Sequence, residues 1–230
     1  MSMVEFEIVL LSLKVSSVAI LAMLPVAFAL AWLLARKRFA GKILLDAVVH
    51  LPLVLPPVVT GWLLLLAFGA SGPIGRLLDG LFGASVMFRW TGAAIAAAIM
   101  ALPLMVRAMR LSLEAVDRRL ESAARTLGAG RWRTFASITL PLALPGVLAA
   151  MVLGFARSIG EFGATITFVS NIPGETRTLP LAIYTALQVP GSEAAVTRLA
   201  VISVLLSLGA LVASELLVRR SGYGRGRHFV

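Results

Sequence analysis

The sequence contains no cysteine, two histidines and few charged side chains, and each shortage excludes a class of protein. Without cysteine there is no disulfide framework, no thiol nucleophile and no Cys/His zinc site, so we expect no bound metal. Charged residues make up 14% of the 230 residues, whereas a water-soluble domain carries about 25%. Hydrophobic residues make up 59%, and the mean hydropathy is +0.95. The composition predicts an integral membrane protein rather than a soluble enzyme.

The sequence also lacks the side-chain sets that carry out catalysis. His50 lies near an expected membrane face and His228 in the C-terminal tail, so no Ser, His and Asp set can be assembled. Asp46 and Asp79 lie near the ends of apolar runs, whereas an intramembrane protease needs paired catalytic groups inside them. No G-x-x-x-x-G-K-[ST] stretch is present to cradle nucleotide phosphates. We expect neither enzymatic activity nor a cofactor, and energy for any driven process must come from a partner.

Long runs of weakly charged residues predict an all-α, polytopic bundle of about five membrane-spanning helices, since roughly 20 apolar residues span a bilayer. The runs are 15–35, 47–75, 90–106, about 142–169 and 199–218. They form one domain over 1–218, followed by a basic tail at 219–230. A shorter uncharged piece, 178–192, is interpreted as a peripheral or re-entrant helix.

The second run contains three prolines, which remove backbone donors and bend a helix. Such bends are tolerated where neighbouring helices satisfy the freed carbonyls, so we expect this span inside the bundle. Pro52, Pro56 and Pro57 form either a hinge or a static kink.

The distribution of Lys and Arg predicts the orientation. Most of the 21 Lys and Arg residues lie in the segments 36–42, 107–133 and 219–227. By the positive-inside rule these segments face the cytoplasm, which places the N-terminus outside and the C-terminus inside. The net charge of +10 therefore reflects topology, and we expect no nucleic-acid partner. The outer arginines Arg76, Arg89 and Arg177 are either a docking rim for a binding protein or ordinary surface charge.

One long inward segment, 111–140, is charged and helix-forming. It divides into a first helix over 114–127 and a second over 131–138, which Pro141 would stop. Gly128 and Gly130 lie between them, as expected where a helix ends in a left-handed conformation. Two helices joined by a tight turn and projecting from the membrane form a shape that suits docking to a partner protein.

This segment resembles the EAA loop of permease subunits in bacterial ABC importers, whose pattern is EAA, three residues, Gly, nine residues, then I-x-L-P. Ala123, Ala124 and Gly128 keep the spacing to Ile138, Leu140 and Pro141, while Ser122 stands at the usual Glu position and Glu121 precedes it. The resemblance implies a coupling helix over 122–129 that binds a separate ATPase subunit, and a type I importer permease fold. The implied coupling residues are Glu121, Ser122, Ala123, Ala124, Arg125, Leu127, Gly128, Ala129, Ile138, Leu140 and Pro141. The alternative is a solubilised amphipathic linker.

Three further blocks, 50–65, 101–117 and 155–180, resemble permease subunits of molybdate importers, and the similarity runs over about 11–218. Sulfate and thiosulfate permeases share much of these blocks, and the compact length favours molybdate. The resemblance implies a homodimer in the bacterial inner membrane with two cytoplasmic ATPase subunits and a periplasmic oxyanion-binding protein. It implies import of molybdate, or of tungstate. From another class, the alternative is a secondary transporter or channel that works without ATP.

The fourth run contains the expected pathway or gate residues. Arg157 and Glu161 are four residues apart and can pair on one helical face, either as a structural pair or with Arg157 drawing an oxyanion through the pathway. Gly160 and Gly163 would interrupt the helix, and Phe162 is either a plug or ordinary packing. Neutral groups that either donate to a dianion or bond their own helix are Thr60, Thr165, Thr167, Ser170 and Asn171.

Overall fold

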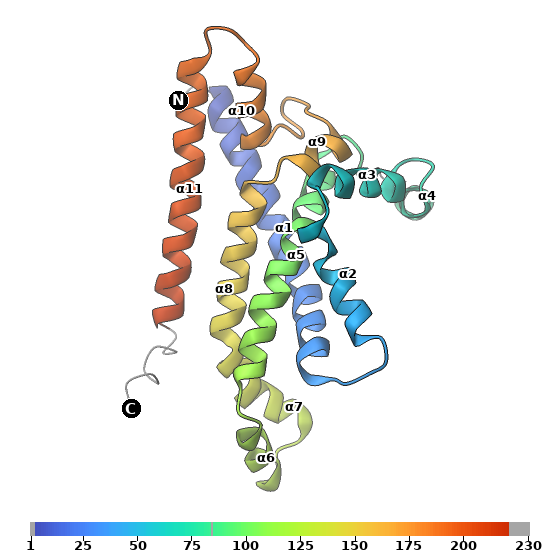
Figure 1. Ribbon diagram of the computed structural model, residues 1–230, viewed down its shortest axis with the longest axis vertical. Helices are drawn as coiled ribbons and strands as arrows, with labels where there is room; N and C mark the ends of the chain where they lie inside the picture. Colours follow the sequence, from blue (N-terminus) through green and yellow to red (C-terminus); the bar gives the residue numbers. More distant parts are fainter. Residues whose placement is uncertain (1–2, 84, 221–230) are drawn as a thin grey trace.

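A computed structural model describes residues 3–83 and 85–220, so most of the predicted basic tail at 219–230 lies outside the described residues. Every regular element in the described part is helical, and long helices run side by side along the molecule (Figure 1). Four helices are long and apolar enough to cross a membrane, and a fifth span results if one bent pair is counted. The prediction of an all-α bundle with about five spans is confirmed.

Helix α5 (Trp90–Ala115) forms the centre of the bundle between α1 (Met3–Arg36) and α8 (Leu140–Ile159). Its small residues allow close contact, and Ala93, Ala96 and Ala101 are completely buried. Helix α11 (Glu193–Arg220) lies outside this core and packs mainly against α8. Only 6% of its most apolar stretch is buried, compared with 67% for α5. Of the four long apolar helices described, α11 has the smallest buried share in its most apolar stretch.

The second apolar run is not one helix inside the bundle, as the sequence suggested. It is divided into α2 (Lys42–Val54) and α3 (Pro57–Phe68), which meet at an angle of 116°. Leu55 and Pro56 are extended between them, because Pro56 and Pro57 lack the N–H groups that would continue the helix. Helix α3 and the short α4 (Pro73–Phe82) lead sideways from the bundle (Figure 1).

The fourth run is also broken, at the glycines where an interruption was expected. Helix α8 ends at Ile159, Gly160 closes it, and α9 (Gly163–Val169) starts three residues later. Helix α10 (Leu179–Leu187) has nine residues and is about 14 Å long at 1.5 Å per residue, too short to span a bilayer. It packs against α1 and α11, which fits the peripheral interpretation of 178–192.

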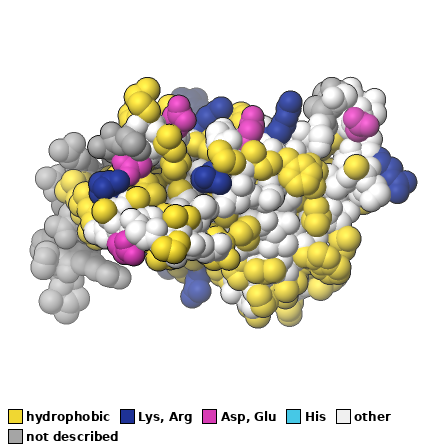
Figure 2. Space-filling model, turned by 90° about the horizontal axis from the view of Figure 1, so that it is seen from above, with side chains coloured by type: hydrophobic (Ala, Val, Ile, Leu, Met, Phe, Trp, Pro, Cys, Tyr) yellow, Lys and Arg dark blue, Asp and Glu magenta, His cyan; other side chains and the backbone are white. Residues whose placement is uncertain are grey.

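Polar contacts fasten the long helices at both ends of the molecule. Arg198 of α11 donates to Glu5 of α1 over 2.8 Å, and Arg110 of α5 pairs with Asp46 of α2 over 3.1 Å. Seen from the end opposite α6, acidic and basic side chains are interspersed (Figure 2).

Candidate functional site

A projecting elbow forms the end of the molecule farthest from α10 (Figure 1). We define it as α6 (Arg118–Thr126), α7 (Arg131–Thr134) and the π-helical turn Phe135–Thr139. None of the residues of α6 is buried. Helix α6 starts later than the predicted 114–127, because α5 continues to Ala115 and Asp117 caps α6 by accepting from the Arg119 N–H over 2.8 Å. Residues 111–115 therefore belong to a long helix and not to the loop.

The turn of the elbow depends on the left-handed backbone of Gly128. Its φ is +87°, and the N–H groups of Gly128 and Ala129 donate to the carbonyls of Arg125 and Ala124 over 3.0 Å each. These bonds satisfy carbonyls at the end of α6, as in a glycine-terminated helix. A β-carbon at Gly128 would meet nothing within 4 Å. The position therefore needs glycine for its conformation, and not for space within this chain.

The second half of the elbow continues into the membrane without a stop at Pro141, contrary to the sequence prediction. Residues 131–159 form one continuous helical segment of 29 residues. The Leu140 N–H donates to the Phe135 carbonyl, five residues back, which gives the wider turn of a π-helix. Pro141 follows this turn within the first residues of α8. The missing N–H of proline is tolerated because the hydrogen-bond register shifts just before it.

A half-buried carboxylate joins the elbow to the rest of the bundle. Glu121 Oε1 accepts from Arg36 Nη2, at the end of α1, over 2.9 Å, and from Thr139 Oγ1 over 2.6 Å. The side chains of Arg36 and Glu121 are only 9% and 12% exposed. Glu121 thus joins α6 to α1 and to the π-helical turn.

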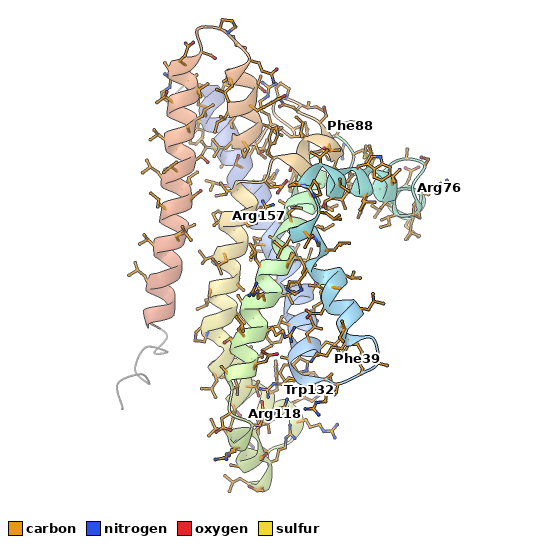
Figure 3. The ribbon with its side chains drawn as sticks, in the orientation of Figure 1. Phe39, Arg76, Phe88, Arg118, Trp132 and Arg157 are labelled. Carbon is orange, nitrogen blue, oxygen red and sulfur yellow. The ribbon has the colours of Figure 1, made fainter. Side chains whose placement is uncertain are left out.

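A second polar cluster lies at the other end of α8, near the break before α9. Arg157 Nη1 and Glu161 Oε2 are 2.7 Å apart, and Glu161 Oε1 accepts from the Ala164 N–H over 2.8 Å. The Glu161 side chain is 2% exposed and that of Arg157 is 26% exposed. Arg157 lies far along the bundle from Arg118 and Trp132 of the elbow (Figure 3). Glu161 therefore neutralises the charge of Arg157 and accepts a hydrogen bond from the first turn of α9.

Helices α3 and α9 are in close contact beside this cluster. A β-carbon at Gly163 would lie 2.8 Å from Pro57 Cβ, and one at Gly61 would lie 2.6 Å from the Ala164 carbonyl oxygen. Two residues that the sequence placed in separate groups, Pro57 of the hinge and Gly163 of the gate, therefore touch. Phe162 packs against Tyr184 of α10 with ring centroids 5.0 Å apart.

The elbow and the Arg157–Glu161 pair lie at the two ends of α8. A profile of the family described as "Binding-protein-dependent transport system inner membrane component" matches residues 18–223. The chain belongs to this family.

Named permease proteins are similar to the chain over most of their length. The molybdenum transport system permease proteins ModB of Escherichia coli K12 and Haemophilus influenzae are 60% and 58% identical, over 97% and 94% of both chains. The sulfate transport system permease protein CysT of Escherichia coli K12 is 38% identical, over 85% of this chain and 69% of its own. The resemblance to molybdate permeases is confirmed.

Solved structures of transporters of this kind share the fold. The MetNI methionine ABC transporter in an inward-facing conformation has a chain of TM-score 0.73 at 17% identity, with 96% of this chain and 99% of that chain covered. A bacterial alginate ABC transporter gives TM-score 0.73 at 17% identity, with 96% and 80% covered. The chain is a multi-pass membrane protein with the fold of an ABC importer permease.

Most of the predicted site residues of this permease-family chain fall in the two places described. The motif residues from Glu121 to Ala129 lie on α6 and its turn, and Ile138 closes the π-helical turn with Thr139. Thr165 is buried in α9, and Thr167 donates to the Gly163 carbonyl of its own helix over 2.9 Å. Asn171 donates to Thr185 and accepts from Arg177. Pro52 lies inside α2, apart from the α3 and α9 contact.

Sequence reasoning missed three partners of these residues: Arg36, Thr139 and Tyr184. A hydroxyl between Ile138 and Leu140 was visible in the motif, but its bond to Glu121 was not. The exposed Arg76 donates to the Ser71 carbonyl close to it in sequence, and it shows no link to the buried clusters.

Replacing Glu121 with alanine is expected to destabilise the elbow and lower the melting temperature of the detergent-solubilised chain. Removing one member of this largely enclosed pair costs about 3 kcal/mol, because Arg36 keeps its charge without a partner. The matched control is Glu114→Ala, since Glu114 pairs with Arg110 over 2.8 Å but its side chain is 41% exposed. Equal melting temperatures for the two variants would contradict the structural role of Glu121.

Proposed function

We propose that this chain is the permease subunit of an ATP-driven importer of molybdate, or of tungstate, in the bacterial inner membrane. The high identity to two molybdenum permeases over nearly the full length supports the substrate. The chain is multi-pass, and its N-terminus lies outside and its C-terminus inside by the distribution of Lys and Arg.

The observation that carries the proposal is the exposed elbow. The elbow presents unburied small residues, including Ala123 on α6 and Gly128 in the turn after it, beyond the end of the bundle. Such a surface fits a cleft in another protein, and the sequence has no phosphate-binding loop of its own. An ATPase subunit that binds α6 would supply the energy of ATP hydrolysis for transport.

The complete transporter would hold two copies of this chain, two ATPase subunits and a periplasmic oxyanion-binding protein, all within a lipid membrane. Closure of the ATPases would rotate the permeases between inward-facing and outward-facing states, a rigid-body switch. The face of α11 that is left uncovered is available to lipid or to the second copy. The outer arginines Arg76, Arg89 and Arg177 would meet the binding protein.

The pathway assignment rests on the cluster at the break between α8 and α9. Gly160 and Phe162 form the irregular backbone next to the Arg157–Glu161 pair. A fully formed ion pair supports a structural role, because a strong free anion site midway would trap the ion. Pro56 and Pro57 then act as a rigid bend, since Pro57 packs against Gly163.

Sulfate or thiosulfate transport is the second candidate, supported by the 38% identity to a sulfate permease. ATP-independent transport is the alternative from another class. Both are separated from the proposal in proteoliposomes that contain the chain, its cognate ATPase and its cognate binding protein. Molybdate is expected to stimulate ATP hydrolysis and uptake, while sulfate leaves both unchanged. Stimulation by sulfate alone would select the second candidate, and uptake without nucleotide and ATPase would select the third.

A further inference from the structure

A basic pocket lies between the end of α1 and the elbow. Its volume is about 430 Å³. Five cationic side chains and one carboxylate line it: Arg36, Lys37, Arg118, Arg125, Arg131 and Glu121. Among the described residues, no ion pair joins Lys37, Arg118, Arg125 or Arg131 to a carboxylate. The pocket therefore carries an excess of positive charge that the chain does not neutralise.

A buried donor at this pocket lacks an acceptor. The Arg36 side chain is 9% exposed, and its Nε is buried with no hydrogen-bond partner, although its Nη2 binds Glu121. A buried donor without a partner is costly, and most such groups in folded proteins are satisfied. Arg36 therefore has a donor beside the pocket that no acceptor of the described residues satisfies.

An apolar groove adjoins the basic pocket. Its volume is about 710 Å³, and it shares Trp32, Lys37, Arg131 and Phe135 with the pocket. Phe28 and Trp32 pack edge-to-face against Phe135, with the Trp32 and Phe135 centroids 5.1 Å apart. Trp132, which is 84% exposed, forms the outer wall. Aromatic rings of this kind gather where hydrocarbon meets lipid headgroups.

We propose that the pocket and groove together bind one anionic phospholipid, whose headgroup phosphate lies among the cations and whose acyl chain lies against Phe28, Trp32 and Trp132. The excess positive charge of the pocket matches a phosphate. The apolar groove favours a lipid over a free phosphate ion, because only the lipid has an apolar tail. Cationic pockets on the cytoplasmic side of membrane helices attract acidic headgroups. This assignment rests on the inward orientation of the elbow proposed above. The lipid would then bridge α1 to the coupling helix beside the Arg36–Glu121 bond.

The test is tryptophan quenching by brominated lipid in nanodiscs of phosphatidylcholine. A Trp62→Phe, Trp90→Phe background leaves Trp32 and Trp132 as the only reporters. Brominated phosphatidylglycerol is expected to quench them more strongly than brominated phosphatidylcholine at equal mole fraction. Lys37→Gln, Arg125→Gln and Arg131→Gln are then combined into a triple variant. The preference for phosphatidylglycerol over phosphatidylcholine should fall by about fivefold for each cation removed, until the two lipids quench alike.

The matched control neutralises three exposed neighbours that do not line the pocket, Arg38→Gln, Arg119→Gln and Arg133→Gln, and should keep the preference. Native mass spectrometry of the chain with all four tryptophans should show retained phosphatidylglycerol. Equal loss in both triple variants, or no loss in the first, overturns the proposal. So does removal of the preference by millimolar inorganic phosphate, which would indicate a free-ion site, or by the ATPase subunit, which would indicate a protein contact. None of these readouts depends on transport, so failure here is distinct from failure of the proposed function.

Discussion

Gly128→Val is expected to reduce nucleotide-driven uptake by about tenfold or more, while membrane insertion stays normal. A left-handed residue with a β-carbon costs about 1–2 kcal/mol, and 1.4 kcal/mol corresponds to tenfold in the population of the native turn. The strain falls on the turn between α6 and α7, where φ is +87°. Uptake in proteoliposomes and the amount of inserted protein are the two measurements.

Two companion variants separate the conformation of the turn from bulk on its surface. Gly128→Asn should retain most uptake, because asparagine tolerates the left-handed region better than valine. Gly130→Val adds the same side chain at φ −65°, again with nothing within 4 Å, and should also retain uptake. Wild-type uptake by Gly128→Val would remove the turn from the mechanism. Equal losses at both glycines would assign the effect to bulk in a partner's cleft.

Glu161→Ala is expected to be among the most destabilising single substitutions in the chain. It removes the 2.7 Å pair with Arg157 and the acceptor for the Ala164 N–H at a side chain that is 2% exposed. Breaking a buried pair costs about 3–5 kcal/mol, and losing a helix cap costs about 1 kcal/mol more. The melting temperature in detergent should fall accordingly.

Further variants at this pair separate its structural role from a role in the pathway. Glu161→Gln loses the charge but keeps an oxygen for the cap, and should be less destabilised than Glu161→Ala. The exchange Arg157→Glu with Glu161→Arg restores the pair but supplies no acceptor for Ala164, so stability should return only in part. If Glu161→Ala melts like the wild type but does not transport, the structural interpretation is wrong and the pair belongs to the pathway.

The long helices could be predicted from the sequence because a bilayer leaves few alternatives. An uncharged run of about 20 residues must satisfy its backbone internally, and a helix does so. Gly160 and Gly163 marked the break in the fourth run for a local reason, the weakness of glycine in a helix. The elbow was visible because charge, motif spacing and Gly128 agreed.

The bends and the long-range contacts could not be predicted in the same way. Proline removes one donor, but whether Pro56 kinks a helix or ends it depends on what α3 packs against. Pro141 was expected to stop a helix, and the π-helical turn before it prevents this. Arg36 and Glu121 are 85 residues apart in sequence, and no local pattern connects them. Phe162 and Tyr184 are also far apart in sequence, and their contact depends on the tertiary packing of α10.

Residues 131–159 form one continuous helical segment that joins the elbow to the break before α9. At 1.5 Å per residue this rod is about 40 Å long, similar to a full bilayer with its headgroups. The helix continues past Pro141 and Pro145, and its first break is at Gly160. Residues 131–159 therefore connect α7 directly to the break before α9, where the Arg157–Glu161 pair lies.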